Sequence, residues 1–177
     1  NCCIIGHSMG GKVAMQLSIE KPGIIEKLVV VDIAPKFYAR HHDYILEGLA
    51  ILEHNQLESR SKADELLSEK INEKGIRQFL LKNLFRDENN RLILRLNLKA
   101  ISKNLDEIGK GLPDNAQFSG STLFIRGEKS TYIKTTDQKI IQNHFPNAGL
   151  KTIENAGHWV HAEQPTVFFK AVNDYLK

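Results

Sequence analysis

Three things that this sequence lacks narrow its class. It has no apolar run near the ~20 residues of a membrane-spanning helix, so no membrane span is predicted. It has no large excess of one charge, because a formal net charge of +3 is too small to indicate a nucleic-acid partner. It also has no cysteine framework: Cys2 and Cys3 are adjacent on a predicted strand and point to opposite faces, which argues against a bridge between them. Two thiols that look buried favour a reducing, cytoplasmic location.

The composition that is present is ordinary for a globular protein. The chain has 177 residues, of which 41% are hydrophobic and 25% are charged. These values match average globular usage, and the length is enough for about one domain with its own core. The informative features are therefore local motifs rather than bulk properties.

A strand, a sharp turn and a helix are predicted at the start of the chain. The apolar residues 2–5 favour a strand buried on both faces, and residues 13–19 favour a helix that ends before Lys21-Pro22-Gly23. The turn between them, GHSMG, has the G-x-S-x-G pattern that lifts a nucleophilic serine out of a sheet. We therefore predict Ser8 as a nucleophile.

The neighbours of this serine have predicted roles as well. The backbone N–H of Met9 lies at the start of the predicted helix, where it can donate to a developing oxyanion. His7 is expected to pack beside the turn and to contribute to the substrate pocket rather than to transfer protons.

A serine nucleophile requires a base, and a late histidine is the best candidate. His158 follows a predicted strand over residues 150–153, and Gly157 gives its loop backbone freedom. The histidine is also last in the chain order that this type of site shows. His161 is the alternative base, although it is expected to pack against the last helix. Trp159 is predicted to line the substrate pocket. No further ligand cluster accompanies the two histidines, so no metal is predicted.

Two carboxylates could orient this base. Asp32 directly follows the apolar strand 28–31, and Glu128 follows the strand 121–126. Both strand ends are places where parallel sheets bind ligands. Asp32 is favoured because the acid must be held rigidly and partly buried, and Glu128 remains the alternative.

The middle of the chain has a different pattern. Residues 37–118 show helical apolar spacing and no strand-like alternation, so we predict a helical cap there, with the core formed by residues 1–36 and 119–177. A cap inserted after Asp32 would cover the site and shape an acyl pocket; the alternative is a separate helical domain without a binding role. Four basic residues recur every four positions and would form one stripe for phosphate if all were helical: Arg91, Arg95, Lys99 and Lys103.

Five segments together resemble a known superfamily. GHSMGGKVAM, KLVVVDIAP, RLNLKAI, TLFIRGEKSTYI and NAGHWVHAEQP are similar to the C-terminal two-thirds of α/β-hydrolases, and in particular to the small bacterial esterases of the YbfF type, which include acyl-CoA thioesterases. Most α/β-hydrolases carry the acid where this chain has Ser130. The YbfF-type subgroup shares that departure and uses the aspartate of the VVVDIAP strand, which implies a triad of Ser8, Asp32 and His158, with Glu128 still open.

The resemblance implies an α/β fold, parallel strands with flanking helices and an inserted cap, and a serine hydrolase. Such an enzyme would cleave small-molecule esters or acyl-CoA thioesters through an acyl-enzyme and without a cofactor. The alternatives are haloperoxidase, C–C hydrolase or lyase chemistry, or an inactive binding module. The superfamily pattern also has a segment before the elbow that supplies a second oxyanion donor, so we expect this chain to be cut from a longer one and to have little activity in isolation. Acyl preference and oligomeric state are not predicted.

Overall fold

The computed structural model describes residues 1–40 and 43–177. The elements follow the chain in this order: β1 (Cys2–His7), α1 (Met9–Glu20), η1 (Pro22–Ile24), β2 (Ile25–Val31), α2 (Asp43–His54), α3 (Arg60–Ser68), α4 (Lys74–Leu81), β3 (Leu84–Arg86), β4 (Leu92–Leu94), α5 (Leu98–Lys103), α6 (Leu105–Gly109), β5 (Ser121–Gly127), η2 (Thr135–Asp137), α7 (Gln138–His144), β6 (Ala148–Ile153), α8 (Val160–Glu163) and α9 (Pro165–Leu176).

The chain forms two compact units. The first contains residues 1–38 and 110–177, and the second contains residues 39–109. The second unit is shorter than the cap predicted over residues 37–118. The difference has a packing cause, because Phe118 is buried in the core of the first unit and the Tyr38 hydroxyl donates to the carbonyl of Tyr132 in that same unit.

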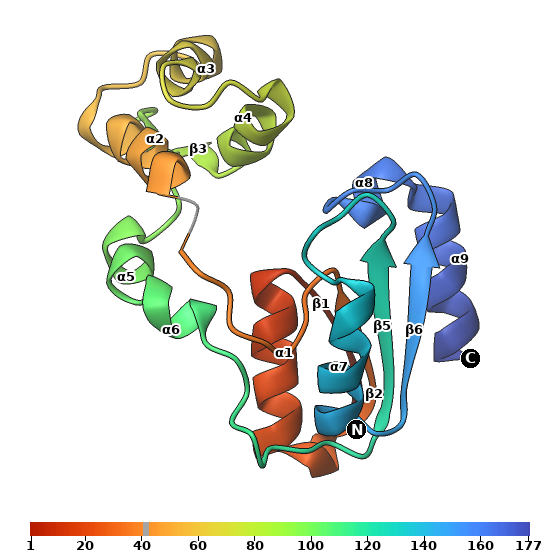
Figure 1. Ribbon diagram of the computed structural model, residues 1–177. Helices are drawn as coiled ribbons and strands as arrows, with labels where there is room; N and C mark the ends of the chain where they lie inside the picture. The colour runs from red at the N-terminus through yellow and green to blue at the C-terminus, as the bar shows by residue number, and fades with distance from the viewer. Residues whose placement is uncertain (41–42) are drawn as a thin grey trace. The chain divides into compact units, whose positions relative to one another are not determined.

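The first unit is built on a parallel sheet. Among the described residues, four strands pair in the order β1-β2-β5-β6, all parallel. His7 pairs with Val31, and Val31 pairs with Ile125, so the carboxyl ends of three strands are level with one another. This register places Ser8, Asp32 and the residues after Gly127 at one edge of the sheet, where the strands in Figure 1 end in arrowheads.

Helices cover both faces of this sheet. Ala14 and Met15 of α1 and Ile141 of α7 pack with Leu28 and Phe124 on one face. The other face packs against α9, which lies beside β6 in Figure 1. The architecture is an α/β arrangement of parallel strands with flanking helices, as the sequence predicts.

The predicted burial of the first strand was wrong. Cys2 and Cys3 are exposed, and Ile5 retains 50% of its accessible surface. In the described residues, the cluster under α9 draws its strand residues from β2, β5 and β6 and none from β1. The two thiols are therefore not the buried thiols that the sequence suggested.

The second unit has a core of its own. Leu52 of α2, Leu67 of α3 and the following Ile71 are almost fully buried together. The sequence prediction of helices without strands was wrong at one point, because β3 and β4 form an antiparallel hairpin with Leu84 opposite Leu94. Asn90 supplies the positive φ of 60° that its turn requires. Three-residue strands are too short for alternation to distinguish them from a helix.

The hairpin also breaks the predicted basic stripe. Arg91 precedes β4 and pairs with Asp87, and the Arg95 guanidinium lies over the ring of Phe85. Only Lys99 and Lys103 lie on a common helix, α5. These four side chains therefore do not form one helical row for a phosphate group.

In the part of the chain that the structure describes, no helix has both the length and the apolar character needed to cross a membrane.

Candidate active site

Ser8 occupies the turn between β1 and α1. Its backbone has a φ of 54° and a ψ of −120°, a strained positive-φ conformation that is unusual for a residue other than glycine, and its N–H donates to the carbonyl of Val31 over 3.0 Å. Helix α1 begins at the next residue, Met9. The turn therefore presents the serine hydroxyl at a helix N-terminus, beyond the end of the sheet.

The turn requires a glycine at position 6. A Cβ at Gly6 would lie 2.3 Å from the carbonyl oxygen of Gly10, which is backbone and has little freedom to move. We expect Gly6→Ala to lower the free energy of unfolding by about 1–3 kcal/mol through overpacking, as measured by urea denaturation. Gly10→Ala is the matched control, since its added Cβ would meet no atom within 4 Å. Equal stability of the two variants would contradict the steric argument.

His158 joins Ser8 to a carboxylate. Its Nε2 lies 3.0 Å from the Ser8 Oγ, and its Nδ1 lies 2.7 Å from Asp32 Oδ2. In the tautomer with the proton on Nδ1, the imidazole donates to Asp32 and accepts from the Ser8 hydroxyl. The structure thus brings together Ser8, His158 and Asp32, which come from three separate parts of the sequence.

Asp32 is fully buried and is held from several sides. Its own φ is 52°, a left-handed conformation, directly after β2. The backbone N–H of Gly127 donates to Oδ1 over 3.0 Å, and the Ser130 hydroxyl donates to Oδ2. These bonds satisfy a buried carboxylate that would otherwise be costly to desolvate. The sequence analysis had treated Ser130 only as a missing acid and had not predicted its hydrogen bond to the acid that is present.

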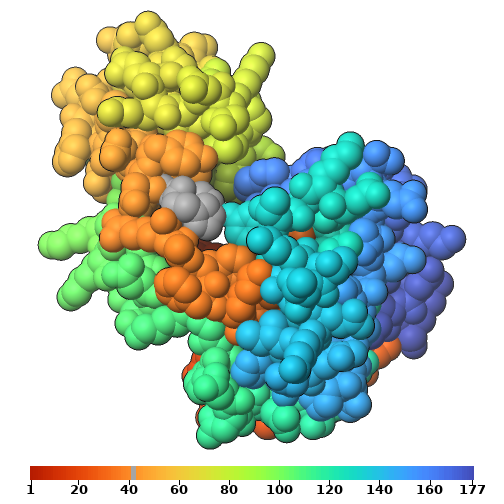
Figure 2. Space-filling view, in the orientation of Figure 1, coloured from red at the N-terminus to blue at the C-terminus, as the bar shows by residue number. Residues whose placement is uncertain are grey.

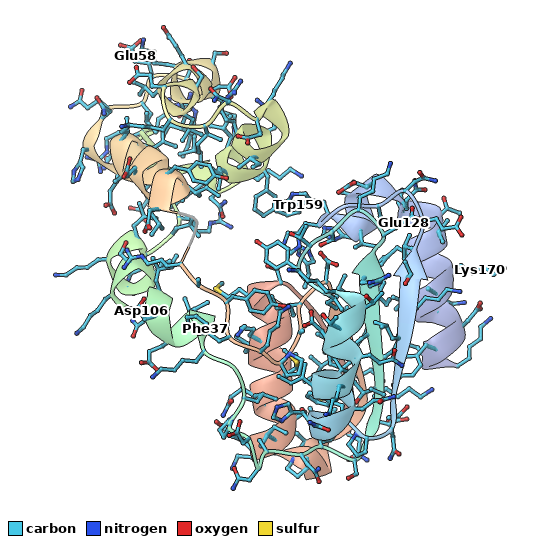
Figure 3. The ribbon with its side chains drawn as sticks, viewed as in Figure 1. Phe37, Glu58, Asp106, Glu128, Trp159 and Lys170 are labelled. Atoms are coloured by element: carbon cyan, nitrogen blue, oxygen red, sulfur yellow. The ribbon has the colours of Figure 1, made fainter. Side chains whose placement is uncertain are left out.

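Glu128, the alternative acid, has a different partner. Its Oε2 accepts the backbone N–H of Asn155 over 2.9 Å. Figure 3 labels Glu128 and Trp159 on loops beyond the arrowhead ends of β5 and β6. The structure therefore places Asp32 on the imidazole of His158, and places Glu128 on the backbone of the loop that carries this histidine.

Glu163 also holds this loop, and the sequence analysis missed it. One carboxylate oxygen accepts the N–H of Gly157 over 2.7 Å, and the other accepts the N–H of Trp159 over 3.0 Å. The two donors flank His158, so one side chain fixes the backbone on both sides of the base. The only sequence signal was a glutamate shortly after the histidine.

Aromatic rings surround the base. His7 Nε2 forms a 2.8 Å hydrogen bond with the carbonyl oxygen of His158. The His7 ring centroid is 5.5 Å from that of Trp159 and 4.9 Å from that of His161. Burial lowers the pKa of His7, and the hydrogen bond to the His158 carbonyl partly opposes this shift. His7 and Trp159 therefore lie against the base, and their predicted pocket roles stay predictions.

His161 was the alternative base. Its ring lies 6.1 Å from that of Phe168 on α9, while His158 makes the bond to Ser8. The described residues contain no group of three or more histidine, cysteine, aspartate or glutamate side chains arranged to hold a metal ion.

The hydroxyl–imidazole–carboxylate chain defines a class of chemistry. An imidazole oriented by a buried carboxylate can take the proton of a serine hydroxyl as that oxygen attacks a carbonyl carbon. The same contacts at the ends of parallel strands are typical of serine hydrolases with an α/β sheet.

Comparisons with known proteins agree with this class. The model of the alpha/beta hydrolase family matches residues 1–171, and the chain belongs to that family. It is 40% identical to the mouse (Mus musculus) sn-1-specific diacylglycerol lipase ABHD11 over 99% of this chain and 59% of that protein. It is 34% identical to esterase YbfF of Escherichia coli over 97% of this chain and 66% of the other.

A solved structure supports the same assignment. A marine microorganism esterase superimposes with a TM-score of 0.92 at 36% identity, over 98% of this chain and 69% of that one. The chain spans somewhat less than two thirds of the curated mouse relative, and the predicted family and fold are both confirmed.

Proposed function

We propose that the protein is a serine hydrolase that cleaves carboxylic esters through an acyl-enzyme on Ser8. The observation that carries this proposal is the continuous contact from Ser8 Oγ to His158 Nε2 and from His158 Nδ1 to Asp32. Relatives named as esterases and lipases support the reaction class.

The proposed mechanism has two halves. In the first, His158 Nε2 takes the proton of Ser8 as Oγ bonds to the ester carbonyl carbon, and the alkoxide leaving group departs with that proton. In the second, His158 removes a proton from water as the water oxygen attacks the acyl carbon, the bond between that carbon and Ser8 Oγ breaks, the carboxylic acid leaves, and the proton returns to Ser8. Asp32 stays ionised and stabilises the imidazolium formed in each half. The oxyanion accepts the N–H of Met9. The second donor is the one that the superfamily pattern supplies from a segment before the turn that carries Ser8.

The finer features of the predicted function belong to the same proposal. The name of the mouse relative suggests a glycerolipid ester as one substrate class, and the resemblance to YbfF-type enzymes suggests acyl-CoA thioesters as another. A covering role for the helical unit and a cytoplasmic location also remain proposals. The cytoplasmic location is supported by two free cysteines, Cys2 and Cys3.

Hydrolysis assays test this proposal. The whole protein is expected to turn over p-nitrophenyl butyrate and to gain the mass of one fluorophosphonate group. The same assay with butyryl-CoA, in which the released thiol is measured, compares the rate of thioester hydrolysis with that of ester hydrolysis. Absence of both turnover and adduct in the folded protein would favour the binding-module alternative.

A further inference from the structure

We propose that Tyr132 is a positioning residue for His158: its ring sets the tilt of the imidazole. The inference rests on the proposed function of Ser8 and His158. Tyr132 lies in the loop after β5, and its ring stacks on that of His158 with centroids 3.9 Å apart and planes 18° from parallel.

The stack supplies a restraint that the hydrogen bonds of His158 do not. Its bonds to Ser8, 3.0 Å, and to Asp32, 2.7 Å, leave from opposite nitrogens in the plane of the ring. Two bonds of this kind fix a line through the imidazole but resist only weakly a rotation about that line. A flat ring against one face opposes this rotation, because tilting would separate or overlap the two surfaces.

Tyr132 is itself fixed through its backbone. Its N–H donates to the Ser130 hydroxyl oxygen over 3.2 Å, and its carbonyl accepts the Tyr38 hydroxyl over 2.6 Å. That hydroxyl in turn accepts the N–H of Ala34 over 2.9 Å. Burial raises the pKa of Tyr38, so its phenol stays protonated and remains a donor.

These contacts join the loop of Tyr132 to the segment that follows β2. In the same segment, the ammonium group of Lys36 donates to the Asp137 carboxylate of η2 over 2.5 Å. Figure 2 shows the corresponding orange and cyan surfaces in contact. The backbone of Tyr132 is thus held by hydrogen bonds at both its N–H and its carbonyl, which is the support that a positioning side chain requires.

A comparison of Tyr132→Leu with Tyr132→Phe tests the proposal. Leucine keeps an apolar cover but removes the π face, whereas phenylalanine keeps that face. With p-nitrophenyl butyrate, Tyr132→Leu is expected to lower kcat about 10-fold with little change in KM. Tyr132→Phe is expected to restore kcat to near that of the wild type.

Tyr175→Leu is the matched control, because this α9 tyrosine bonds the Ser121 hydroxyl over 2.8 Å and has no ring contact with His158 recorded in the structure. It is expected to lower stability without lowering kcat. A Tyr132→Leu enzyme with wild-type kcat, or the same loss of kcat in Tyr175→Leu, would overturn the proposal.

A signal independent of turnover separates this inference from the proposed function. The His158 Nδ1 proton bonded to Asp32 should give a downfield proton resonance in the wild type that broadens or shifts in Tyr132→Leu and is retained in Tyr132→Phe. If the wild type hydrolyses no ester, the proposed function fails, and the resonance still decides whether Tyr132 positions the ring. An unchanged resonance in Tyr132→Leu would count against the proposal.

Discussion

Replacement of Ser8 by alanine is expected to lower kcat for ester hydrolysis by about 10⁶-fold and to abolish the fluorophosphonate adduct. The reason is that alanine has no hydroxyl oxygen to attack the substrate, so His158, which lies 3.0 Å from Ser8 Oγ, has no nucleophile to activate. The residual rate would come from substrate binding and oxyanion stabilisation alone. Intact-mass spectrometry after labelling and steady-state kinetics with p-nitrophenyl butyrate measure the two effects.

Ser18→Ala is the matched control for this experiment. Ser18 lies on helix α1, which follows Ser8, is fully buried, and donates its hydroxyl to the carbonyl of Met15 over 2.7 Å. Its removal is expected to lower stability slightly and to leave labelling intact. A Ser8→Ala protein that still carries the adduct would show that another side chain is the nucleophile.

The second large effect is expected at the acid. Asp32→Asn should lower kcat by about 10⁴-fold, because an amide cannot hold His158 in the same tautomer or stabilise an imidazolium as a carboxylate does. Asparagine tolerates the left-handed backbone at this position, so the fold should survive. Comparison of kcat for the wild type and the variant, with circular dichroism to verify folding, measures the effect.

Glu128→Gln separates the two candidate acids. Glu128 bonds the N–H of Asn155, and a glutamine retains a carbonyl oxygen for that bond. Its kcat is expected to stay within about 3-fold of the wild type, the scale of a surface substitution. A large loss in Glu128→Gln together with a small one in Asp32→Asn would reverse the assignment of the acid.

The sequence was informative wherever chemistry and local pattern coincide. The strand–turn–helix around Ser8 could be predicted because apolar runs and glycines have local causes, and Asp32 because it directly follows a buried strand. The late position of His158 relied on chain order. These three side chains lie in contact in the structure, and their catalytic roles remain predictions for the variants above to test.

Other parts of the site depend on contacts that no local pattern encodes. The hydroxyl of Ser130 bonds a carboxylate 98 positions away in the chain, and Tyr132 stacks on a ring from a different strand end. The hairpin at Leu84 follows from the pairing of two very short segments. Such features are set by tertiary structure, which overrides local preference.

The pairing of β2 with β5 has a consequence for how such sites can change over time. Because Val31 and Ile125 are direct partners, the side chains at positions 32 and 130 come from the ends of adjacent strands and meet each other: the Ser130 hydroxyl donates to the Asp32 oxygen that contacts Nδ1 of His158. An ancestor with carboxylates at both places would pass through a state in which either could be lost while the other continued to serve. Two lineages can in this way share the same arrangement of base and acid while one carries the acid at position 32 and the other at position 130. The base has an acid partner at every stage of that change.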